Sequence, residues 1–447
     1  MKIVMFSDAY WPRVNGVTVS VDSYSRALIK AGHEVLVICS SYPEGMDAAS
    51  SFSVDRKPDD EGPKIVRVPS LPAFITKEDR IAKFSKWHWV FRQVEAFNPG
   101  IIHINTEFVI AEIGFLYAQA HNLPVIYTFH TMWEDYSPNY FPLVPSFFIK
   151  FIARSVCKII LFQSYRVIVP TPQIDKVVHN YSPRTKTFLL PTGIEPELFD
   201  HTDEEGEVFR KKMEESFPKI RGKRILLFAG RIAKEKNLGL LLNILPEILK
   251  KHPDAVLLFA GSGPDLDFFR EEAKKKGLEG SCVFSGYVER RDLALIYRIS
   301  EVFLFPSLTD TQGLVTLEAM FSGTPVVAIG ALGTLMVMGG DNGGFMVKND
   351  EGEFTARVLE LLGDGDLRSR KSDEARLHAR SWSIEELTKK LTDIYKTTAD
   401  EYRKDYGESR MPVWELVMDK RWWEINNKIF KRRTRQIWHQ MRSKLNT

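Results

Sequence analysis

The chain has 447 residues, which is more than one hydrophobic core usually supports, so the sequence predicts two domains. With 44% hydrophobic and 27% charged residues, the composition is ordinary for a folded soluble protein. The net charge of +3 is too small to indicate a nucleic-acid-binding protein.

Three cysteines and the N-terminus bear on the cellular compartment. Cys39, Cys157 and Cys282 lie far apart in apolar surroundings without metal-site spacing, and their odd number argues against a disulfide framework. A reducing, cytoplasmic compartment is therefore expected. The N-terminal apolar run is too short for a signal peptide, and no run of about 18 apolar residues predicts a membrane-spanning helix. Any membrane contact should be peripheral, on the inner face of the membrane.

Strand-like apolar runs alternate with helix-like segments from one end of the chain to the other. This alternation predicts parallel α/β architecture. A helix is expected from about residue 18 to 31, with Gly32 as its C-cap, and a loop at 46–62. The first half contains six predicted buried strands, at residues 3–6, 35–39, 65–68, 101–104, 125–129 and 166–169.

The pattern restarts after residues 190–196, whose two prolines and one glycine would stiffen and turn the chain. We expect an N-terminal Rossmann-like domain at 1–195, a second one at 196–385, and a C-terminal helix and basic tail at 386–447. Two doubly wound domains would present the loops at the carboxyl ends of their strands to a shared cleft. The second half contains five predicted strands, at residues 224–229, 255–260, 282–284, 302–305 and 325–329.

Four segments of the second half are predicted to converge on a nucleoside diphosphate. In the first, a strand runs into Gly230, and two cations, Arg231 and Lys236, follow five residues apart at a helix entrance. The glycine lets the backbone turn, and the cations and the helix N-terminus suit a pyrophosphate. The alternative is that both cations only solvate the start of the helix.

Glycine-containing loops follow the next two predicted strands. Gly261 opens a Gly-Ser-Gly-Pro loop that resembles a phosphate loop, although these four residues also form ordinary turns. The loop Gly286-Tyr287-Val288 would bracket a base through backbone contacts and packing, or it is only the end of a strand.

The most informative segment spans residues 305–320, where a strand ends, a polar loop follows and a helix begins. Asp310 lies in the loop, and Glu318 follows eight residues later in the first helical turns. A loop carboxylate can bind sugar hydroxyls, and a helical carboxylate can accept both ribose hydroxyls in a bidentate bond. The free N–H groups around Gly313 and Leu314 would point at a ligand placed there.

Together with residues 230–237, this segment resembles the signature of the retaining glycosyltransferases of family 4, which have the GT-B fold. That signature holds two acidic residues separated by seven others, within a Pro-Ser and Leu-Glu-Ala-Met pattern. The resemblance extends from residue 1 to about 402 and includes Asn15-Gly16-Val17, Thr128-Phe129-His130, residues 191–194 and Trp382.

The resemblance implies a donor site formed mainly by the second domain. It implies a nucleotide-sugar donor, no cofactor and no divalent metal. The positions carried over are the diphosphate-binding Arg231 and Lys236, the ribose-binding Glu318, the sugar-binding Asp310 with the backbone at Gly313 and Leu314, and Gly16, whose amide would approach the donor phosphate.

His130 stands at the end of a predicted strand, where a histidine is often only structural. Its place at the carboxyl end and the polar and aromatic residues 133–136 that follow favour a functional role. The resemblance implies front-face attack, in which the departing phosphate accepts the acceptor's proton. His130 would then stabilise charge and position the sugar, rather than act as a nucleophile.

Two departures from the family pattern concern the donor sugar. Asp310 stands where most relatives have glutamate, and Gln312 replaces the usual phenylalanine. The form found here resembles the bacterial diacylglycerol glucosyltransferases, whereas Thr-Asp-Thr also occurs in mannosyl-transferring relatives. We therefore expect glucose from a UDP-sugar, with a GDP-mannose-dependent mannosyltransferase as the alternative.

The segment Asp364-Gly365-Asp366 mimics the metal-binding acidic pair of the other glycosyltransferase fold. It lies in a connection between two predicted helical segments, so we expect a solvated turn. Nothing else in the sequence calls for a divalent metal.

Three segments combine aromatic residues with cations: residues 80–97, residues 147–162 and the tail. For 147–162 we expect a helix whose apolar side packs in the core, and 80–97 is compatible with core packing or membrane contact. Between residues 420 and 444 the tail has nine cations against Glu424 alone, which favours docking on an anionic membrane surface. Packing of the tail on the N-terminal domain is the alternative, and no nucleic-acid partner is expected.

The sequence thus predicts an α/β, GT-B, retaining and metal-independent enzyme that transfers a hexose to a membrane lipid such as diacylglycerol or a glycolipid. One alternative is a transferase that acts on a soluble sugar or sugar phosphate. Another is a catalytically silent GT-B scaffold that binds a membrane or protein partners.

Overall fold

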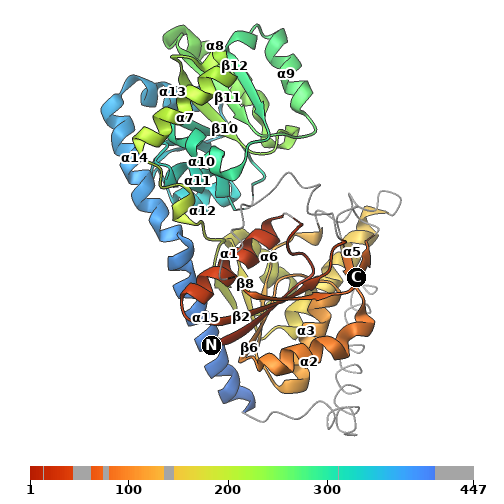
Figure 1. Cartoon of the computed structure of the whole chain (residues 1–447). Coiled ribbons are helices and arrows are strands. Elements are labelled where there is room, and N and C mark those ends of the chain that lie inside the picture. The colour runs from red at the N-terminus through yellow and green to blue at the C-terminus, as the bar shows by residue number, and fades with distance from the viewer. Residues whose placement is uncertain (14, 44–61, 74–79, 135–144, 311, 408–447) are drawn as a thin grey trace.

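The computed structural model describes residues 1–13, 15–43, 62–73, 80–134, 145–310 and 312–407. These residues form two α/β domains, and a long helix, α15 (Ile384–Tyr406), runs from the second domain along the first (Figure 1). The basic tail after residue 407, and with it the predicted membrane contact of that tail, lies outside the described residues, as do residues 46–61 of the predicted loop.

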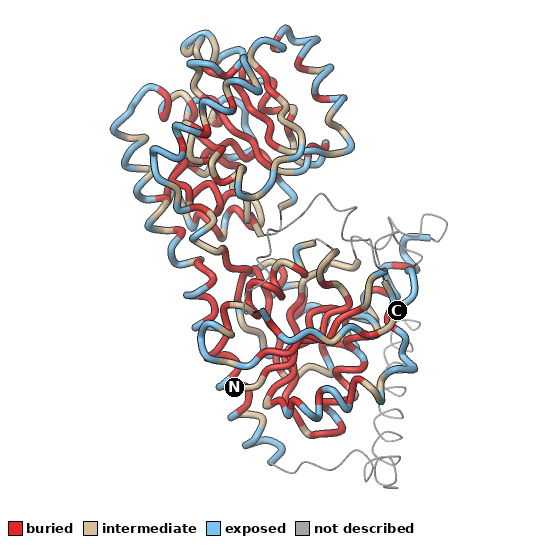
Figure 2. Tube along the Cα trace, in the orientation of Figure 1, coloured by how far each residue is buried: buried red, intermediate tan, exposed pale blue. Residues whose placement is uncertain are grey.

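The N-terminal domain is built on a parallel sheet of seven strands in the order β3-β2-β1-β6-β7-β8-β9. All six strands predicted for this half are present, and β6, β7 and β8 are buried along their whole length (Figure 2). The prediction of burial is wrong for β3, because this strand lies at the edge of the sheet and only its Val68 is buried. The apolar pattern does not predict β9, because this short edge strand is only partly buried. The strands are β1 (Lys2–Ser7), β2 (Glu34–Ser40), β3 (Lys64–Val68), β6 (Ile101–Ile104), β7 (Val125–Thr128), β8 (Arg166–Val169) and β9 (Thr187–Leu189).

Helices pack on both faces of this sheet. Two of them begin at residues suited to capping: Asn15 Oδ1 accepts a hydrogen bond from Thr18 N at 2.8 Å, and Thr171 caps the helix that starts with Pro172. A separate antiparallel pair, β4 (Ser70–Pro72) and β5 (Arg80–Ala82), lies beside the sheet. The helices are α1 (Gly16–Lys30), α2 (Trp87–Phe97), α3 (Val109–His121), α5 (Ser146–Gln163) and α6 (Pro172–Tyr181).

The C-terminal domain contains a second parallel sheet, with six strands in the order β12-β11-β10-β13-β14-β15. The five strands predicted for this half are confirmed. β15 is absent from the prediction because it begins at a glycine. The strands are β10 (Arg224–Ala229), β11 (Ala255–Ala260), β12 (Cys282–Gly286), β13 (Val302–Phe305), β14 (Val326–Ile329) and β15 (Gly344–Val347).

The strands of this domain are apolar on both faces because helices cover both sides of the sheet, as in other parallel α/β domains. In β10 and β11, every residue from Ile225 to Ala229 and from Ala255 to Ala260 is buried. The helices are α7 (Asp203–Ser216), α8 (Leu238–Lys251), α9 (Leu266–Lys275), α10 (Arg290–Arg298), α11 (Leu314–Phe321), α12 (Leu332–Met338), α13 (Glu351–Gly363) and α14 (Gly365–Ala379).

The chain passes between the domains twice, and the two passages lie side by side. Ile194 N donates to Trp382 O at 3.2 Å, and Ile384 N donates to Ile194 O at 2.8 Å. After the second passage, α15 packs on α1, with Leu391 and Tyr395 in one buried cluster with Val21 and Tyr24. The N-terminal domain therefore takes part of its core from the C-terminal end of the described chain.

The two internal segments that mix aromatic residues and cations differ in burial. In α2, Val90, Phe91, Val94 and Phe97 are buried, so one face of this helix packs in the core, whereas most residues from 83 to 88 are exposed. The expectation for 147–162 is wrong in part, since only one face of α5 packs in the core and six large apolar side chains between residues 147 and 159 are exposed. In the described residues, no helix is long and apolar enough to cross a bilayer.

Candidate active site

The order of strands in the C-terminal sheet reverses between β10 and β13. The chain adds β11 and β12 on one side of β10, and it adds β13, β14 and β15 on the other side. Doubly wound domains bind ligands at such a switch point, beyond the carboxyl ends of the strands. Lys236 comes from the loop after β10 and Asp310 from the loop after β13, and Lys236 Nζ lies 2.8 Å from Asp310 Oδ2. Two of the four predicted donor-binding side chains thus meet at the switch point.

Backbone contacts hold the loop around Asp310. Its Oδ1 accepts a hydrogen bond from Gly313 N at 3.2 Å, and its carbonyl oxygen accepts one from Gly333 N at 3.0 Å. Gly313 has a φ of +66°, and a Cβ at this position would lie 3.0 Å from the carbonyl carbon of Gly333. This close approach fixes the Asp310 carboxylate beside Lys236, and Leu314 begins α11 next to it.

Glu318 lies on α11, and its side chain is buried. Tyr297 donates its hydroxyl to Glu318 Oε2 at 3.3 Å, and Arg290 Nη2 lies 3.5 Å from Glu318 Oε1. Burial raises the pKa of the Glu318 carboxyl, and the neighbouring Arg290 and Tyr297 oppose that shift. The carboxylate is therefore held in a fixed position by two side chains of α10.

Arg231 has a different environment from the other three predicted side chains. It forms an ion pair with Glu235, four residues further along the chain, and its side chain is 62% exposed. Among the described residues, no hydrogen bond or ion pair joins Arg231 to Lys236, Asp310 or Glu318. The structure places it on the same loop as Lys236, with its guanidinium turned to solvent.

The loops after β10, β11 and β12 meet at the same edge of the sheet. Gly261 has a φ of +150°, and a Cβ there would lie 1.9 Å from the carbonyl oxygen of Gly230. The Gly261 N–H donates to Gly286 O at 2.9 Å, which brings the loop of Val288 alongside. Val288 packs against the core of the domain. Gly261 is needed at this position because it is the only residue that fits against the neighbouring loop.

We expect Gly261→Ala to lower the free energy of unfolding by about 2–4 kcal/mol, because the methyl group must displace the Gly230 carbonyl and the backbone remains strained. Urea denaturation would measure the change. Gly280→Ala is a matched control, since no atom lies within 4 Å of a Cβ at that position. Equal stability of the two variants would contradict the close packing of the loops.

The N-terminal sheet has its own switch point, between β1 and β6. Gly16, predicted to approach the donor phosphate, follows β1 and is the first residue of α1. It is exposed, and no atom lies within 4 Å of a Cβ built there. The side of Gly16 on which a Cβ would lie is therefore open.

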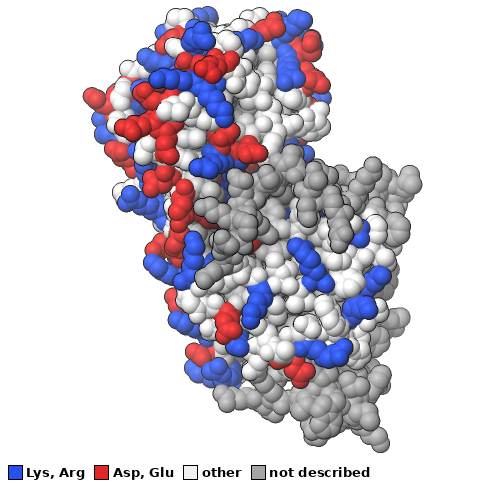
Figure 3. All heavy atoms as spheres, in the orientation of Figure 1, with Lys and Arg blue, Asp and Glu red and all other residues white. Residues whose placement is uncertain are grey.

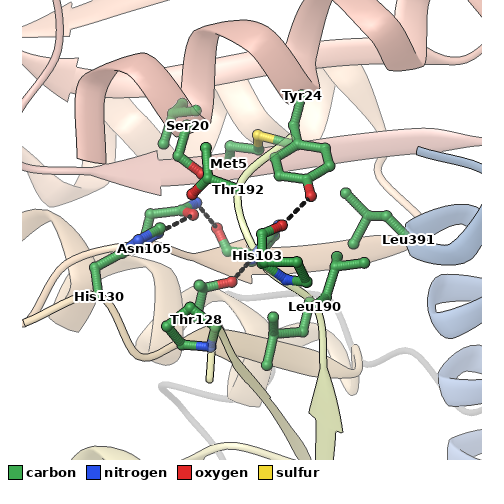
Figure 4. A pocket seen from close by; sticks show the side chains of 14 residues that line it. Met5, Ser20, Tyr24, His103, Asn105, Thr128, His130, Leu190, Thr192 and Leu391 are labelled. Carbon is green, nitrogen blue, oxygen red and sulfur yellow. Dashed lines mark hydrogen bonds between the residues drawn. The ribbon is translucent and has the colours of Figure 1, made fainter. Parts of the chain in front are cut away.

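His130 lines a small cavity at the carboxyl ends of β6 and β7 (Figure 4). The cavity has a volume of about 20 Å³, which is room for one water molecule. His130 Nε2 lies 3.3 Å from Asn105 Oδ1, and burial lowers the pKa of His130 to about 4. The imidazole is therefore neutral near pH 7 and can form hydrogen bonds without carrying a positive charge.

His103 lies in the wall of the same cavity and is absent from the sequence-based prediction. Its Nδ1 is 2.6 Å from the hydroxyl of Tyr395. Its Nε2 is 2.7 Å from Thr128 Oγ1 (Figure 4). Because Tyr395 belongs to α15, this contact joins the sheet of the first domain to the last described helix. Burial lowers the pKa of His103 to about 3.

A pH dependence of stability follows from the buried His103. An unfolded histidine, with a pKa near 6.5, takes up a proton before the folded one does, so folding is favoured above that pH. As the pH falls from about 6.5 to 4, the contribution of His103 to the free energy of unfolding should decrease by about 1.4 kcal/mol per pH unit. Urea denaturation of the wild type and of His103→Gln at pH 7, 6 and 5 would measure the free energy of unfolding of each protein. If this free energy depends on pH equally in both proteins, the predicted effect of His103 is contradicted.

The predicted site residues fall into two groups, one in each domain. The first group contains Lys236, Asp310 and Glu318 with the backbone at Gly313 and Leu314, and the second contains Gly16 and His130. No hydrogen bond or ion pair between described residues joins the two groups. Sequence reasoning missed Arg290 and Tyr297, the partners of Glu318. A signal existed for Arg290, because a cation in the first turn of a helix opposes the helix dipole.

No group of three or more His, Cys, Asp or Glu side chains in the described residues could hold a metal ion. Asp364 caps α14 by accepting a hydrogen bond from Leu367 N at 2.9 Å, so the acidic pair at 364–366 is part of a helix start. Cys39, Cys157 and Cys282 are buried and not disulfide-bonded, and burial raises the pKa of each thiol to about 12.

Two family models match the chain. The model of glycosyltransferase family 4 matches residues 14–198, and the model of glycosyl transferases group 1 matches residues 209–378. The chain is 32% identical to alpha-monoglucosyldiacylglycerol synthase of Streptococcus pneumoniae over 74% of this chain and 71% of the relative. It is 28% identical to the enzyme of the same name from Acholeplasma laidlawii over 90% of this chain and 99% of the relative.

A solved structure has the same fold. The crystal structure of HepE from Anabaena in complex with UDP matches with a TM-score of 0.66 and 13% sequence identity. The match covers 89% of this chain and 99% of HepE, so it includes both domains and their connection.

Proposed function

Because the chain belongs to the glycosyltransferases of group 1 and family 4 and has the GT-B fold, we propose that it transfers glucose from UDP-glucose to a membrane lipid, with retention of configuration and without a metal ion. Two relatives are named as synthases of alpha-monoglucosyldiacylglycerol, which favours diacylglycerol or a glycolipid as acceptor. An α-linked product from α-configured UDP-glucose means retention. The UDP in HepE favours a uridine donor.

The pairing of Lys236 with Asp310 at the switch point of the second sheet carries the proposal. The Lys236 ammonium and the Asp310 carboxylate lie 2.8 Å apart and suit the two parts of a sugar diphosphate. The ammonium would bind the phosphate oxygens, and the carboxylate would accept hydrogen bonds from the sugar hydroxyls. Glu318, eight residues after Asp310 on α11, would accept the ribose hydroxyls.

We assign donor binding to residues 196–385 and acceptor binding to residues 1–195. The remaining residues, 386–447, comprise most of α15 and the tail. Arg231 would join Lys236 on the diphosphate by leaving Glu235, which an exposed ion pair allows at little cost. Gly261, Val288, Gly313 and Leu314 would contact the donor through their backbone and through packing. Gly16 and His130 would approach the reacting sugar from the first domain.

In the proposed step, the bond between the sugar C1 and the diphosphate oxygen breaks, and the acceptor oxygen bonds to C1 on the same face. The acceptor's proton passes to the departing phosphate oxygen, so no protein base is needed. Lys236 and Arg231 stabilise the negative charge that develops on the diphosphate. His130, being neutral, orients a sugar hydroxyl.

The test is a donor and acceptor panel. Thermal shift with UDP-, GDP- and ADP-sugars would identify the donor, and mass spectrometry and NMR of products made with membrane lipid extracts would identify the acceptor and the anomer. We expect stabilisation by UDP-glucose and an α-glucosyl lipid. A β-linked product would overturn retention, GDP-mannose as the only donor would overturn the choice of sugar, and products formed only on soluble sugars would overturn the lipid acceptor. A chain that neither hydrolyses nor transfers any donor would be a silent scaffold.

A further inference from the structure

The helix α5 has two faces of opposite burial. Ile149, Ala153, Cys157 and Ile160 are buried and pack in the core of the first domain. This spacing of three and four residues keeps them on one side of the helix. The helix therefore lies flat on the domain, and its other side is directed away from the core.

The outward side of α5 is unusually apolar. Its large side chains are between 39% and 74% exposed, whereas other strongly exposed apolar residues of the described chain occur mostly singly. A continuous exposed apolar stripe marks a surface that is covered in the working protein. The stripe consists of Phe147, Phe148, Phe151, Ile152, Val156 and Ile159.

One edge of the stripe is cationic. Lys150, Arg154 and Lys158 follow one another at intervals of four residues, and the 18-residue helix contains no Asp or Glu. No described carboxylate lies within 4 Å of Lys150 or Lys158, whereas Arg154 is paired with Glu134. The visible face of the first domain shows broad uncharged areas with few acids, while both charge signs are mixed over the second domain (Figure 3). The cover of α5 should therefore be apolar and negatively charged.

A groove lies beside this edge of α5. Arg154 donates to both carboxylate oxygens of Glu134, and Tyr181 of α6 donates its hydroxyl to the same carboxylate. The groove has a volume of about 440 Å³, and one of its lining residues, Met132, follows His130 by two positions. It is lined by Met132, Glu134, Arg154, Val177, Asn180 and Tyr181.

We propose that α5 is the docking surface for an anionic lipid bilayer. The helix lies in the plane of the interface with its phenylalanines among the acyl chains and with Lys150 and Lys158 at lipid phosphates. Three cations in the helix and the burial of its other face fit a helix that lies on a membrane rather than spans it. The groove then opens at the membrane surface, where a lipid acceptor is delivered; this last point rests on the proposed function.

The test compares the full-length wild type with Phe147→Ser/Phe151→Ser and Lys150→Glu/Lys158→Glu by flotation with vesicles. The vesicles contain phosphatidylcholine with or without phosphatidylglycerol. Val208→Ser/Leu377→Ser is the matched control, because both residues are 70% exposed and belong to the second domain. We expect each α5 variant to lose about tenfold or more in partitioning onto anionic vesicles, and the control to behave as wild type. Binding of the wild type should weaken without phosphatidylglycerol and at high salt.

Several outcomes would overturn the docking surface. Equal flotation of wild type and α5 variants would place the membrane contact elsewhere, for example on the tail at 408–447. A wild-type dimer in size-exclusion chromatography that Phe147→Ser/Phe151→Ser converts to a monomer would make a second copy the cover of α5.

The docking surface and the proposed function can fail separately. Transfer to a detergent-solubilised lipid acceptor tests the enzyme without a bilayer, and the α5 variants should retain it. If the α5 variants lose the flotation of the wild type and no form of the protein transfers a sugar, the docking surface is supported and the proposed function is rejected. If the protein transfers the sugar and the α5 substitutions leave flotation unchanged, the proposed function is supported and the docking surface is rejected.

Discussion

Replacing Lys236 with alanine is expected to lower kcat/KM for glycosyl transfer by about 10²–10³-fold. The Lys236 ammonium lies 2.8 Å from Asp310 Oδ2 and is only 16% exposed, so its charge acts in a region with little solvent. Its loss would remove stabilisation of the charge that develops on the departing diphosphate, and it would leave the Asp310 carboxylate without its partner. The measurement is steady-state kinetics with the donor identified by thermal shift.

Lys234→Ala provides the control for this experiment. Lys234 lies on the same short segment and carries the same charge, but it is exposed, and its Nζ lies over the ring of Phe268 at 4.4 Å. We expect this variant to transfer at the wild-type rate. If both variants lose activity equally, the effect belongs to the net charge of the loop and not to the contact between Lys236 and Asp310.

Glu318→Gln is expected to weaken UDP binding by about 2–4 kcal/mol while leaving the protein folded. The substitution keeps the shape of the side chain but replaces a two-oxygen acceptor with an amide that accepts at one oxygen only. Because burial already raises the pKa of Glu318, the neutral amide should not destabilise the fold. Isothermal titration with UDP would measure the affinity, and urea denaturation the stability.

A nucleotide without the 2′-hydroxyl separates ribose recognition from a general effect on the site. The wild type should bind 2′-deoxy-UDP more weakly than UDP, and Glu318→Gln should bind the two alike. Wild-type UDP affinity should also decline as the pH is lowered. Because burial raises the pKa of Glu318, the carboxylate takes up a proton more readily, and the protonated carboxyl accepts fewer hydrogen bonds. If Glu318→Gln still prefers UDP to 2′-deoxy-UDP as strongly as the wild type does, the assignment of Glu318 to the ribose is wrong.

Much of the fold could be predicted because the strands of doubly wound sheets are continuous apolar runs. Residues 224–229, 255–260 and 302–305 coincide with β10, β11 and β13 at both ends. Short edge strands such as β9 lack that signal, since partial burial requires no apolar pattern. The register of the two sheets and the side of α5 that faces the core depend on contacts between distant segments.

The candidate site could be predicted in part, and the limit has the same cause. Lys236 and Asp310 are recognisable because each follows a strand, and the topology then brings the two loops together. The contacts of Glu318 with Arg290 and of His103 with Tyr395 join residues 28 and 292 positions apart. Neither spacing nor composition indicates such pairs. The exposure of Phe147 and Phe151 was equally hidden, because an amphipathic helix reads the same whether its apolar side meets protein or lipid.

The path of α15 has a consequence for how the chain is made. Leu391 and Tyr395 complete a buried cluster that begins with Ile3 and Met5, so the first domain lacks part of its interior until residue 395 has left the ribosome. Domains usually fold in the order of their synthesis. Here the domain that emerges first is finished last, after the whole second domain has been translated, and the apolar side chains of α1 must wait uncovered in the nascent chain.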